Sequence, residues 1–212
     1  MESPFCDTCP DDLRVIETIR YDPVQGLCRR DLHLDRLAET CGRLSIPFNR
    51  TQVLASLSDV AGSQRLRVRL SIGLVGDIDL GCQPLVKTSS PWRVAVADDR
   101  LDSNDPWLGV KTTQRRLYDE SRALLPPDVD EFIFLNERGE VCEGTITNVF
   151  VGTTDGMVTP PISSGLLPGV LRHEMLRAGR LTAAVLTLND LRNAGAFFVG
   201  NSLRGLIPAE LV

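Results

Sequence analysis

Two lysines, Lys87 and Lys111, occur in this chain of 212 residues, against twenty-one arginines. Lys111 lies in the segment GVKTTQRRLYD, residues 109–119. A buried lysine amine can lose its proton, whereas the guanidinium of arginine stays charged. Because the chain uses arginine at nearly every other basic position, the lysine at position 111 indicates a residue that does covalent chemistry.

An acidic residue, Glu143, opens a second polar segment, EGTITN, at residues 143–148. Pyridoxal phosphate needs a lysine to form a Schiff base and an acid that keeps its pyridine nitrogen protonated, so that the ring accepts electrons. Lys111 and Glu143 have the residue types that meet these two demands. Each also has an ordinary explanation, because an isolated lysine or glutamate is usually a solvated surface residue.

Three further segments are suited to hold a phosphate group. Gly169 and Val170 open a predicted helix, where backbone N–H groups can bind an anion. Residues 200–202, Gly-Asn-Ser, follow a predicted strand, and Arg36 offers a guanidinium that can neutralise phosphate. The alternatives are a common helix start after Pro168 and an arginine that only flanks an apolar helix face.

Apolar periodicity and turn signals predict an α+β chain of two domains. The first, residues 1–84, is expected to be a small α/β domain with strands at 15–21, 27–30 and 65–72 and with helices at 31–44, capped by Asp31, and at 53–61. Residues 85–92 are expected to be a linker. The larger second domain, residues 93–212, is expected to have strands at 93–97, 131–135, 140–151, 183–188 and 196–199 and helices at 113–125 and 170–178.

Composition narrows the class of protein. The net charge of −5 and the isoelectric point near 5.1 argue against nucleic-acid binding. No apolar run approaches the roughly 18 residues of a spanning helix and no signal peptide is visible, so we expect a cytoplasmic protein without membrane contact. Cys6 and Cys9 form a C-x-x-C pair, but no second pair completes four zinc ligands, and we expect no metal.

Taken together and in order, these segments resemble the fold-type IV pyridoxal-phosphate enzymes, the class IV aminotransferases, from about Val15 to the end of the chain. The matching segments are IETIR at 16–20, HLDRL at 33–37, the segment around Lys111, EGTITNVF at 143–150, GLLPGVLR at 165–172 and GNS at 200–202. The resemblance implies a two-domain fold like that of D-amino-acid aminotransferase and pyridoxal 5'-phosphate as the cofactor. It also implies a homodimer with the active site near the interface, acting on a small amine.

The resemblance also implies roles for individual residues. Lys111 would form the Schiff base and act as general acid and base, and Glu143 would pair with the pyridine nitrogen. The remaining cofactor-binding residues would be Arg36, Thr147, Asn148, Gly169, Val170, Asn201 and Ser202. Tyr118 would lie either near the phenolic oxygen of the cofactor or one helical turn too far along to reach it.

Within the family, KTTxxxxYD and GNSLRG look most like 4-amino-4-deoxychorismate lyases. The candidates to bind substrate carboxylates are Thr18, Arg20, Arg67 and Arg69, while Arg65 and its neighbours could instead form a solvated sheet face. The chain has only residues 1–14 before the first matching strand, where most members have about twenty more, so the substrate contacts transfer least well. The alternatives are a branched-chain or D-amino-acid aminotransferase and a degenerate member without catalysis.

Overall fold

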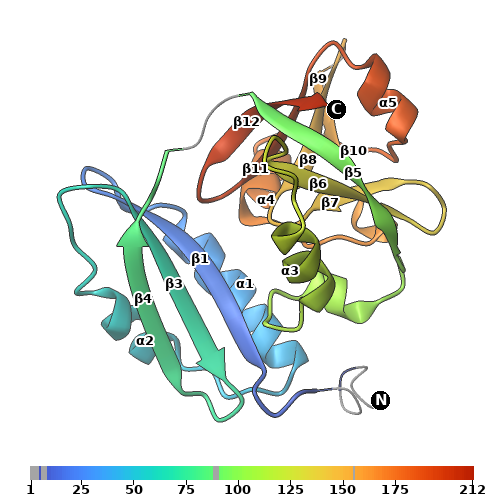
Figure 1. Ribbon diagram of the computed structural model, residues 1–212. Helices are drawn as coiled ribbons and strands as arrows, with labels where there is room; N and C mark the ends of the chain where they lie inside the picture. Colours follow the sequence, from blue (N-terminus) through green and yellow to red (C-terminus); the bar gives the residue numbers. More distant parts are fainter. Residues whose placement is uncertain (1–4, 6–8, 88–90, 155) are drawn as a thin grey trace. The chain divides into compact units, whose positions relative to one another are not determined.

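A computed structural model describes residues 5, 9–87, 91–154 and 156–212 (Figure 1). Contacts between residues divide the chain into two compact units. One comprises Met1–Lys87 and Val110–Gln114, and the other comprises Thr88–Gly109 and Arg115–Val212. The predicted division assigned all of 93–212 to the second domain, whereas the contacts group the segment that contains Lys111 with the first unit. The predicted Cys6–Cys9 pair includes Cys6, which lies outside the described residues.

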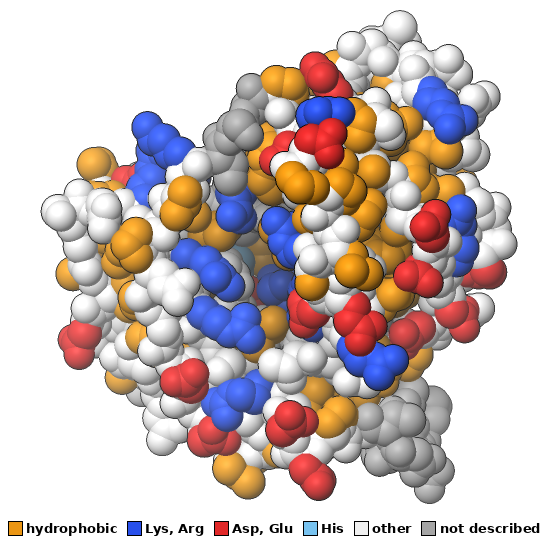
Figure 2. All heavy atoms as spheres, in the orientation of Figure 1, with side chains coloured by type: hydrophobic (Ala, Val, Ile, Leu, Met, Phe, Trp, Pro, Cys, Tyr) orange, Lys and Arg blue, Asp and Glu red, His pale blue; other side chains and the backbone are white. Residues whose placement is uncertain are grey.

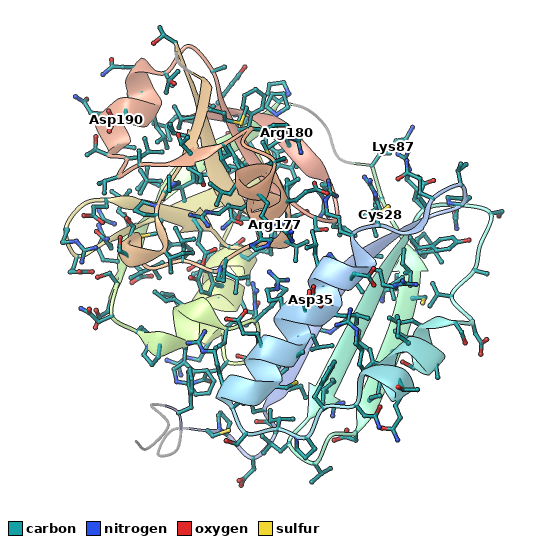
Figure 3. The ribbon with its side chains drawn as sticks, turned by 180° about the vertical axis from the view of Figure 1, so that it is seen from behind. Cys28, Asp35, Lys87, Arg177, Arg180 and Asp190 are labelled. Atoms are coloured by element: carbon teal, nitrogen blue, oxygen red, sulfur yellow. The ribbon has the colours of Figure 1, made fainter. Side chains whose placement is uncertain are left out.

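The first unit is an antiparallel sheet in the order β2-β1-β3-β4. Its strands are β1 (Arg14–Asp22), β2 (Gly26–Leu27), β3 (Leu66–Gly73) and β4 (Ile78–Pro84), and its helices are α1 (Arg30–Arg43) and α2 (Arg50–Leu57). Figures 1 and 3 view this sheet from its two sides, with α1 behind the strands in Figure 1 and in front of them in Figure 3. One face of the sheet therefore packs against α1, and the opposite face is not covered by α1.

Period-two alternation in the strands and period-3.6 spacing in α1 build the core of this unit. Ile19, Val68 and Leu70 from the strands meet Leu34 and Leu37 from α1, and all five are fully buried. Burying one such side chain stabilises the fold by roughly 1.5–3 kcal/mol. The packing therefore fixes which residues of β1 and β3 point toward α1 and which point away.

Two helix starts differ from the expected ones. Asp31 lies inside the first turn of α1, and the N-cap is Arg29, with a left-handed φ of 55° and no side-chain capping bond. The second helix starts at Arg50, earlier than its apolar periodicity indicates, because the Asn49 side chain accepts hydrogen bonds from the N–H groups of Thr51 and Gln52.

The second unit is built on a sheet in the order β10-β9-β8-β11-β12-β5-β6-β7, in which β7 also pairs with β8. That pairing closes six strands into a ring, from which β9 and β10 extend. The strands are β5 (Trp92–Leu101), β6 (Glu131–Asn136), β7 (Val141–Gly144), β8 (Asn148–Thr153), β9 (Gly156–Thr159), β10 (Thr182–Ala183), β11 (Phe197–Asn201) and β12 (Gly205–Leu211). Inward-facing side chains such as Ile133, Val149 and Val199 are fully buried in its core.

The helical segments of the second unit are η1 (Pro106–Gly109), α3 (Arg116–Ala123), η2 (Ile162–Ser164), α4 (Val170–Arg177) and α5 (Leu188–Asn193). The expected helix at 113–125 is shorter at both ends, and the expected strand at 140–151 is broken after Gly144. The expected strand at 183–188 is wrong for most of its length, because Thr187 and Asp190 form a capping box that starts α5.

In the part of the chain that the structure describes, no helix is long and apolar enough to cross a bilayer.

Candidate active site

Lys111 is held in place by β1. Its carbonyl oxygen accepts a hydrogen bond from the N–H of Ile16 at 2.9 Å, and the N–H of Thr113 donates to the carbonyl of Arg14 at 2.9 Å. Val15 and Thr112 form an antiparallel bridge between these two bonds. Because these hydrogen bonds, at Lys111 and two residues after it, tie the segment to the edge of a sheet, the backbone that carries the amine has a defined position.

Arg36, on α1, is gripped by an acid on β1. Its Nε and Nη2 donate to the two carboxylate oxygens of Glu17 at 2.8 and 2.7 Å, and His33 Nδ1 lies 2.6 Å from Glu17 Oε2. Burial alone would raise the pKa of Glu17, but the charges of Arg36 and His33 overcome it and lower the pKa to about 2. Glu17 is therefore ionised and positions the predicted phosphate-binding arginine.

The predicted substrate-binding residues lie together on the face of the sheet that α1 leaves open. Thr18 pairs across the strands with Arg69, and Arg20 pairs with Arg67. Because directly opposite residues on neighbouring strands share a face, these four side chains form one group, which we call the arginine face. Figure 2 shows basic side chains gathered over this part of the first unit.

Arg65 continues the alternation of Arg67 and Arg69 on the same side of the sheet, beside the arginine face. It precedes β3, and its Nε donates to Asp22 Oδ2 at 2.9 Å. The hydrogen bonds that Asp22 accepts from the N–H of Val24 and from Arg65 lower the pKa of this carboxyl. Arg65 is thus an exposed residue with a local partner, as the solvated alternative predicted.

Glu143 lies in β7 and is only 6% exposed. Its Oε1 accepts hydrogen bonds from Tyr118 Oη at 2.8 Å and from the N–H of Leu167 at 3.1 Å. Asn148 Nδ2 donates to Oε2 over 3.4 Å. A buried carboxylate oriented by three donors is the kind of group that can hold a proton on a pyridine nitrogen.

The Tyr118 hydroxyl lies against the carboxylate of Glu143. Burial and the negative charge of Glu143 both raise the pKa of Tyr118, so its hydroxyl stays protonated and donates. The ring meets Phe134 edge to face at 5.2 Å, and the guanidinium of Arg115 lies 5.5 Å from the ring centre. Tyr118 therefore lies beside the acid predicted to pair with the pyridine nitrogen, and its contact with the phenolic oxygen of the cofactor stays a prediction.

The turn 144–147 between β7 and β8 is organised by Glu131, which is fully buried. Its carboxylate accepts hydrogen bonds from the N–H groups of Thr145 and Ile146 at 3.1 and 3.2 Å and from the hydroxyl of Thr147 at 3.0 Å. These bonds divert the backbone from the sheet, which explains why the expected continuous strand is broken. The hydroxyl of Thr147 thus has a partner within the protein, and its predicted contact with the cofactor stays a prediction.

Glu131 was not predicted as a site residue. Arg122 Nη1 donates to it at 3.2 Å, and the N–H of Phe132 donates at 3.1 Å. Burial raises the pKa of Glu131, and the bonds from Thr145 and the charge of Arg122 oppose this. A charged residue that opens an otherwise apolar strand, EFIFL, is the signal that could have found it.

Asn148 and Gly169 belong to one packed corner. Asn148 Nδ2 donates to the carbonyl of Leu167 at 3.0 Å, and a Cβ added to Gly169 would collide with Asn148 Oδ1. Gly169 is the N-cap of α4, so Val170 and the residues after it present the unpaired first N–H groups of a helix. The close approach explains the glycine, and the helix start is suited to bind phosphate.

Asn201 holds the same turn from a different strand. Its Nδ2 donates to the carbonyl of Ile146 at 3.1 Å, and its Oδ1 accepts from the N–H of Arg204 at 2.9 Å. Ser202 beside it is buried. The described contacts of Asn201 are within the protein, and its contact with a cofactor stays a prediction.

Arg172, on α4, is a buried residue that ends the matched segment GLLPGVLR but was not predicted as a site residue. Its Nη2 donates to the carbonyl of Pro160 at 2.8 Å, while its Nε has no hydrogen-bond partner among the described residues. Burial lowers the pKa of Arg172, and the charge of Glu143 opposes this. Arg172 therefore belongs to the electrostatic surroundings of Glu143.

The chain thus supplies the kinds of chemical group that pyridoxal phosphate requires. In the first unit these are the amine of Lys111 and the guanidinium of Arg36; in the second they are the carboxylate of Glu143 and the first N–H groups of α4. No group of three or more His, Cys, Asp or Glu side chains suited to a metal ion occurs among the described residues. The amine, guanidinium, carboxylate and backbone N–H groups fit the chemistry of the cofactor.

Comparison with known proteins agrees with this chemistry. A solved structure from Mesorhizobium loti, provisionally named an amino-acid aminotransferase, is 41% identical with a TM-score of 0.90 and covers 95% of this chain and 100% of that chain. The aminodeoxychorismate lyase of Saccharomyces cerevisiae is 27% identical over 146 residues, which are 60% of this chain but only 39% of that protein. The 4-amino-4-deoxychorismate lyase of Pseudomonas aeruginosa shares the fold, with a TM-score of 0.75, 22% identity and coverage of 93% of this chain and 82% of that chain. Residues 14–212 match the family model for amino-transferase class IV, so the chain belongs to this family, whose members use pyridoxal phosphate.

Proposed function

We propose that this protein is a pyridoxal-phosphate-dependent 4-amino-4-deoxychorismate lyase that releases pyruvate and p-aminobenzoate. The observation that carries the proposal is the arginine face, with Arg20 and Arg67 paired beside Thr18 and Arg69. The proposed substrate has two carboxylates, which guanidinium groups bind well, whereas a branched-chain amino acid has one carboxylate and an apolar side chain. The names of the lyases that the chain resembles support the same substrate.

In this proposal, Lys111 and Glu143 have separate roles in the reaction. Pyridoxal phosphate supplies an electron-accepting ring when it is bound. Lys111 would hold the cofactor through its amine and, once the substrate amine has taken its place, the freed lysine amine would take the proton from the amine-bearing carbon of the substrate. The ether bond to the enolpyruvyl group would then break with its electrons leaving on the oxygen, the carbocycle would become aromatic, and the released enolate would take up a proton to become pyruvate. Glu143, which accepts a hydrogen bond from Tyr118, would keep the proton on the pyridine nitrogen.

An assay without a keto acid tests the proposal. Purified protein reconstituted with pyridoxal phosphate is given 4-amino-4-deoxychorismate alone, and pyruvate and p-aminobenzoate are measured. We expect equal, catalytic amounts of both products, loss of activity in Lys111→Ala and full activity in Lys87→Ala, the other lysine of the chain. Failure of the reconstituted wild type to form either product contradicts the lyase.

An aminotransferase is the second candidate, favoured by the 41% identity to the Mesorhizobium loti structure. The same groups could return the proton to the cofactor instead of breaking the ether bond. Turnover of a branched-chain or D-amino acid with 2-oxoglutarate, without lyase activity, would replace the first proposal with this one. Arg69→Gln should then have little effect on an apolar amino acid, whereas it should raise the KM of the lyase substrate.

A third candidate is a degenerate member that binds a partner or metabolite without catalysis. It predicts a protein that takes up no cofactor and stays colourless. A yellow protein after reconstitution argues against it.

We also propose that the active form is a homodimer, as the family resemblance implies. Size-exclusion chromatography with light scattering measures the mass in solution. A mass of twice the 23.3 kDa of the chain supports the dimer, and a fully active monomer contradicts it.

A further inference from the structure

Glu17, His33 and Arg36 form a buried triad in the first unit. Glu17 and His33 are each 1% exposed and the Arg36 side chain is 12% exposed. His33 and Arg36 are three residues apart on α1, so both project from one side of the helix toward Glu17 on β1. Because Glu17 lies on the face of β1 that carries Val15 and Ile19, the triad is set into the core between strand and helix.

The contacts restrict how Arg36 can turn. Glu17 engages the Nε and Nη2 edge of the guanidinium with two hydrogen bonds, and His33 Nδ1 contacts the carboxylate oxygen that receives Nη2. Two parallel bonds fix the plane of the guanidinium, which one bond would not do. The position of Nη1, which takes no part in these two bonds, is therefore fixed as well.

We propose that Glu17 and His33 are positioning residues that orient the Arg36 guanidinium and thereby raise the affinity for the phosphate group of the cofactor. The inference rests on the proposed function, in which Arg36 contacts that phosphate. Support by a neighbouring shell is a general requirement for a binding group, because a side chain held in one orientation loses less entropy when the ligand binds.

A role in stability and a role in orienting Arg36 make different predictions. A buried ion pair is often no more stabilising than apolar residues of the same volume, since both charges must be removed from water. A purely structural pair would also affect the binding of every form of the cofactor equally. The orienting role affects only ligands that carry the phosphate.

The charge of Glu17 acts in the opposite direction to its orienting effect. A carboxylate beside Arg36 reduces the positive potential that attracts a phosphate dianion. Neutralising Glu17 would therefore strengthen phosphate binding if charge dominated, and weaken it if orientation dominated. The sign of the change separates the two effects.

The test compares pyridoxal phosphate with pyridoxal, which lacks the phosphate, by absorbance titration of purified apoprotein. The variants are Glu17→Gln, which keeps the shape of the side chain, Arg36→Gln, and the double variant. The control is Asp35→Asn on the same helix, an exposed residue paired with Arg50 and labelled in Figure 3. Circular dichroism verifies that each variant is folded. A second and milder test compares two variants of His33: His33→Asn retains a hydrogen-bond donor near the Nδ1 position, and His33→Leu does not.

We expect Glu17→Gln to weaken pyridoxal phosphate about tenfold, a size typical of residues that support a ligating side chain, and to leave pyridoxal within twofold. The effect should disappear in the Arg36→Gln background, and His33→Asn should bind better than His33→Leu. Equal weakening of both ligands, an undiminished effect without Arg36, or tighter binding by Glu17→Gln would overturn the inference. If the wild type binds neither ligand, the proposed cofactor fails, which is a different outcome.

Discussion

Replacing Glu131 by glutamine should loosen the turn that follows Glu143. The carboxylate of Glu131 accepts six hydrogen bonds, from three backbone N–H groups (Phe132, Thr145 and Ile146), two hydroxyls (Thr145 and Thr147) and the guanidinium of Arg122. Glutamine keeps the volume but puts an N–H donor where one carboxylate oxygen accepted. At least one of these buried donors must then lose its acceptor.

The cost follows from which oxygen is lost. Oε1 receives four of the six bonds and Oε2 receives two, from Ile146 N and the Thr147 hydroxyl, so the amide nitrogen costs least at the Oε2 position. The Thr147 hydroxyl can turn and accept a bond, which leaves the N–H of Ile146 unsatisfied at about 1–3 kcal/mol. The weaker bonds of a neutral acceptor add to this and the easier burial of an uncharged group offsets part of it, so we expect a loss of about 2 kcal/mol.

Tryptophan fluorescence is a suitable assay. Both tryptophans, Trp92 and Trp107, belong to the second unit, which also contains Glu131. Urea unfolding followed by this signal should show the loss in Glu131→Gln, while Glu120→Gln, whose ion pair with Arg116 is exposed, should change the free energy of unfolding by less than about 0.5 kcal/mol. Indistinguishable unfolding curves for the two variants would refute the reasoning.

Three further predictions concern other residues. Because the pKa of Glu17 is lowered from 4.5 to about 2, its ion pair stabilises the protein above pH 4.5, and this stabilisation is lost as the pH falls toward 2. In circular dichroism melts, the difference in free energy of unfolding between the wild type and Glu17→Gln should therefore shrink by about 3 kcal/mol over that range, and a constant difference would contradict the prediction. Gly169→Ala should lower the affinity for pyridoxal phosphate roughly tenfold, because the added Cβ meets Asn148, whereas Gly42→Ala, with open space around the new atom, should not; equal titrations of both would contradict this. Tyr118→Phe removes a hydrogen bond to a buried carboxylate and should lower the free energy of unfolding by about 2 kcal/mol in the fluorescence assay, and an unchanged value would show that the bond contributes nothing.

Local patterns predicted the regular elements well. The apolar stripe of α1 and the alternation in β3 are visible in the sequence because each element buries one face against the other. The helix α4 was also predicted within a residue of its observed end. The family resemblance, which rests on several ordered segments, predicted the fold and the cofactor class.

Tertiary contacts decided the elements that the sequence did not predict. Residues 113–114 were expected to be helical, but hydrogen bonds between Thr113 and Arg14, far away in the chain, keep them beside β1. The break after Gly144 depends on Glu131, and the partner of Tyr118 depends on the folding of α3 against β7. The start of α5 is different, because Thr187 and Asp190 form a capping box whose residue types and spacing are visible in the sequence and could have predicted this helix start.

Borohydride reduction of the reconstituted protein tests the central claim most directly. Reduction fixes pyridoxal phosphate to the lysine that holds it, and mass spectrometry of the digested protein identifies that lysine. We predict a single modified site at Lys111, its loss in Lys111→Ala, and an unmodified Lys87. A label on Lys87, or a fully reconstituted protein with no label on either lysine, would contradict the account.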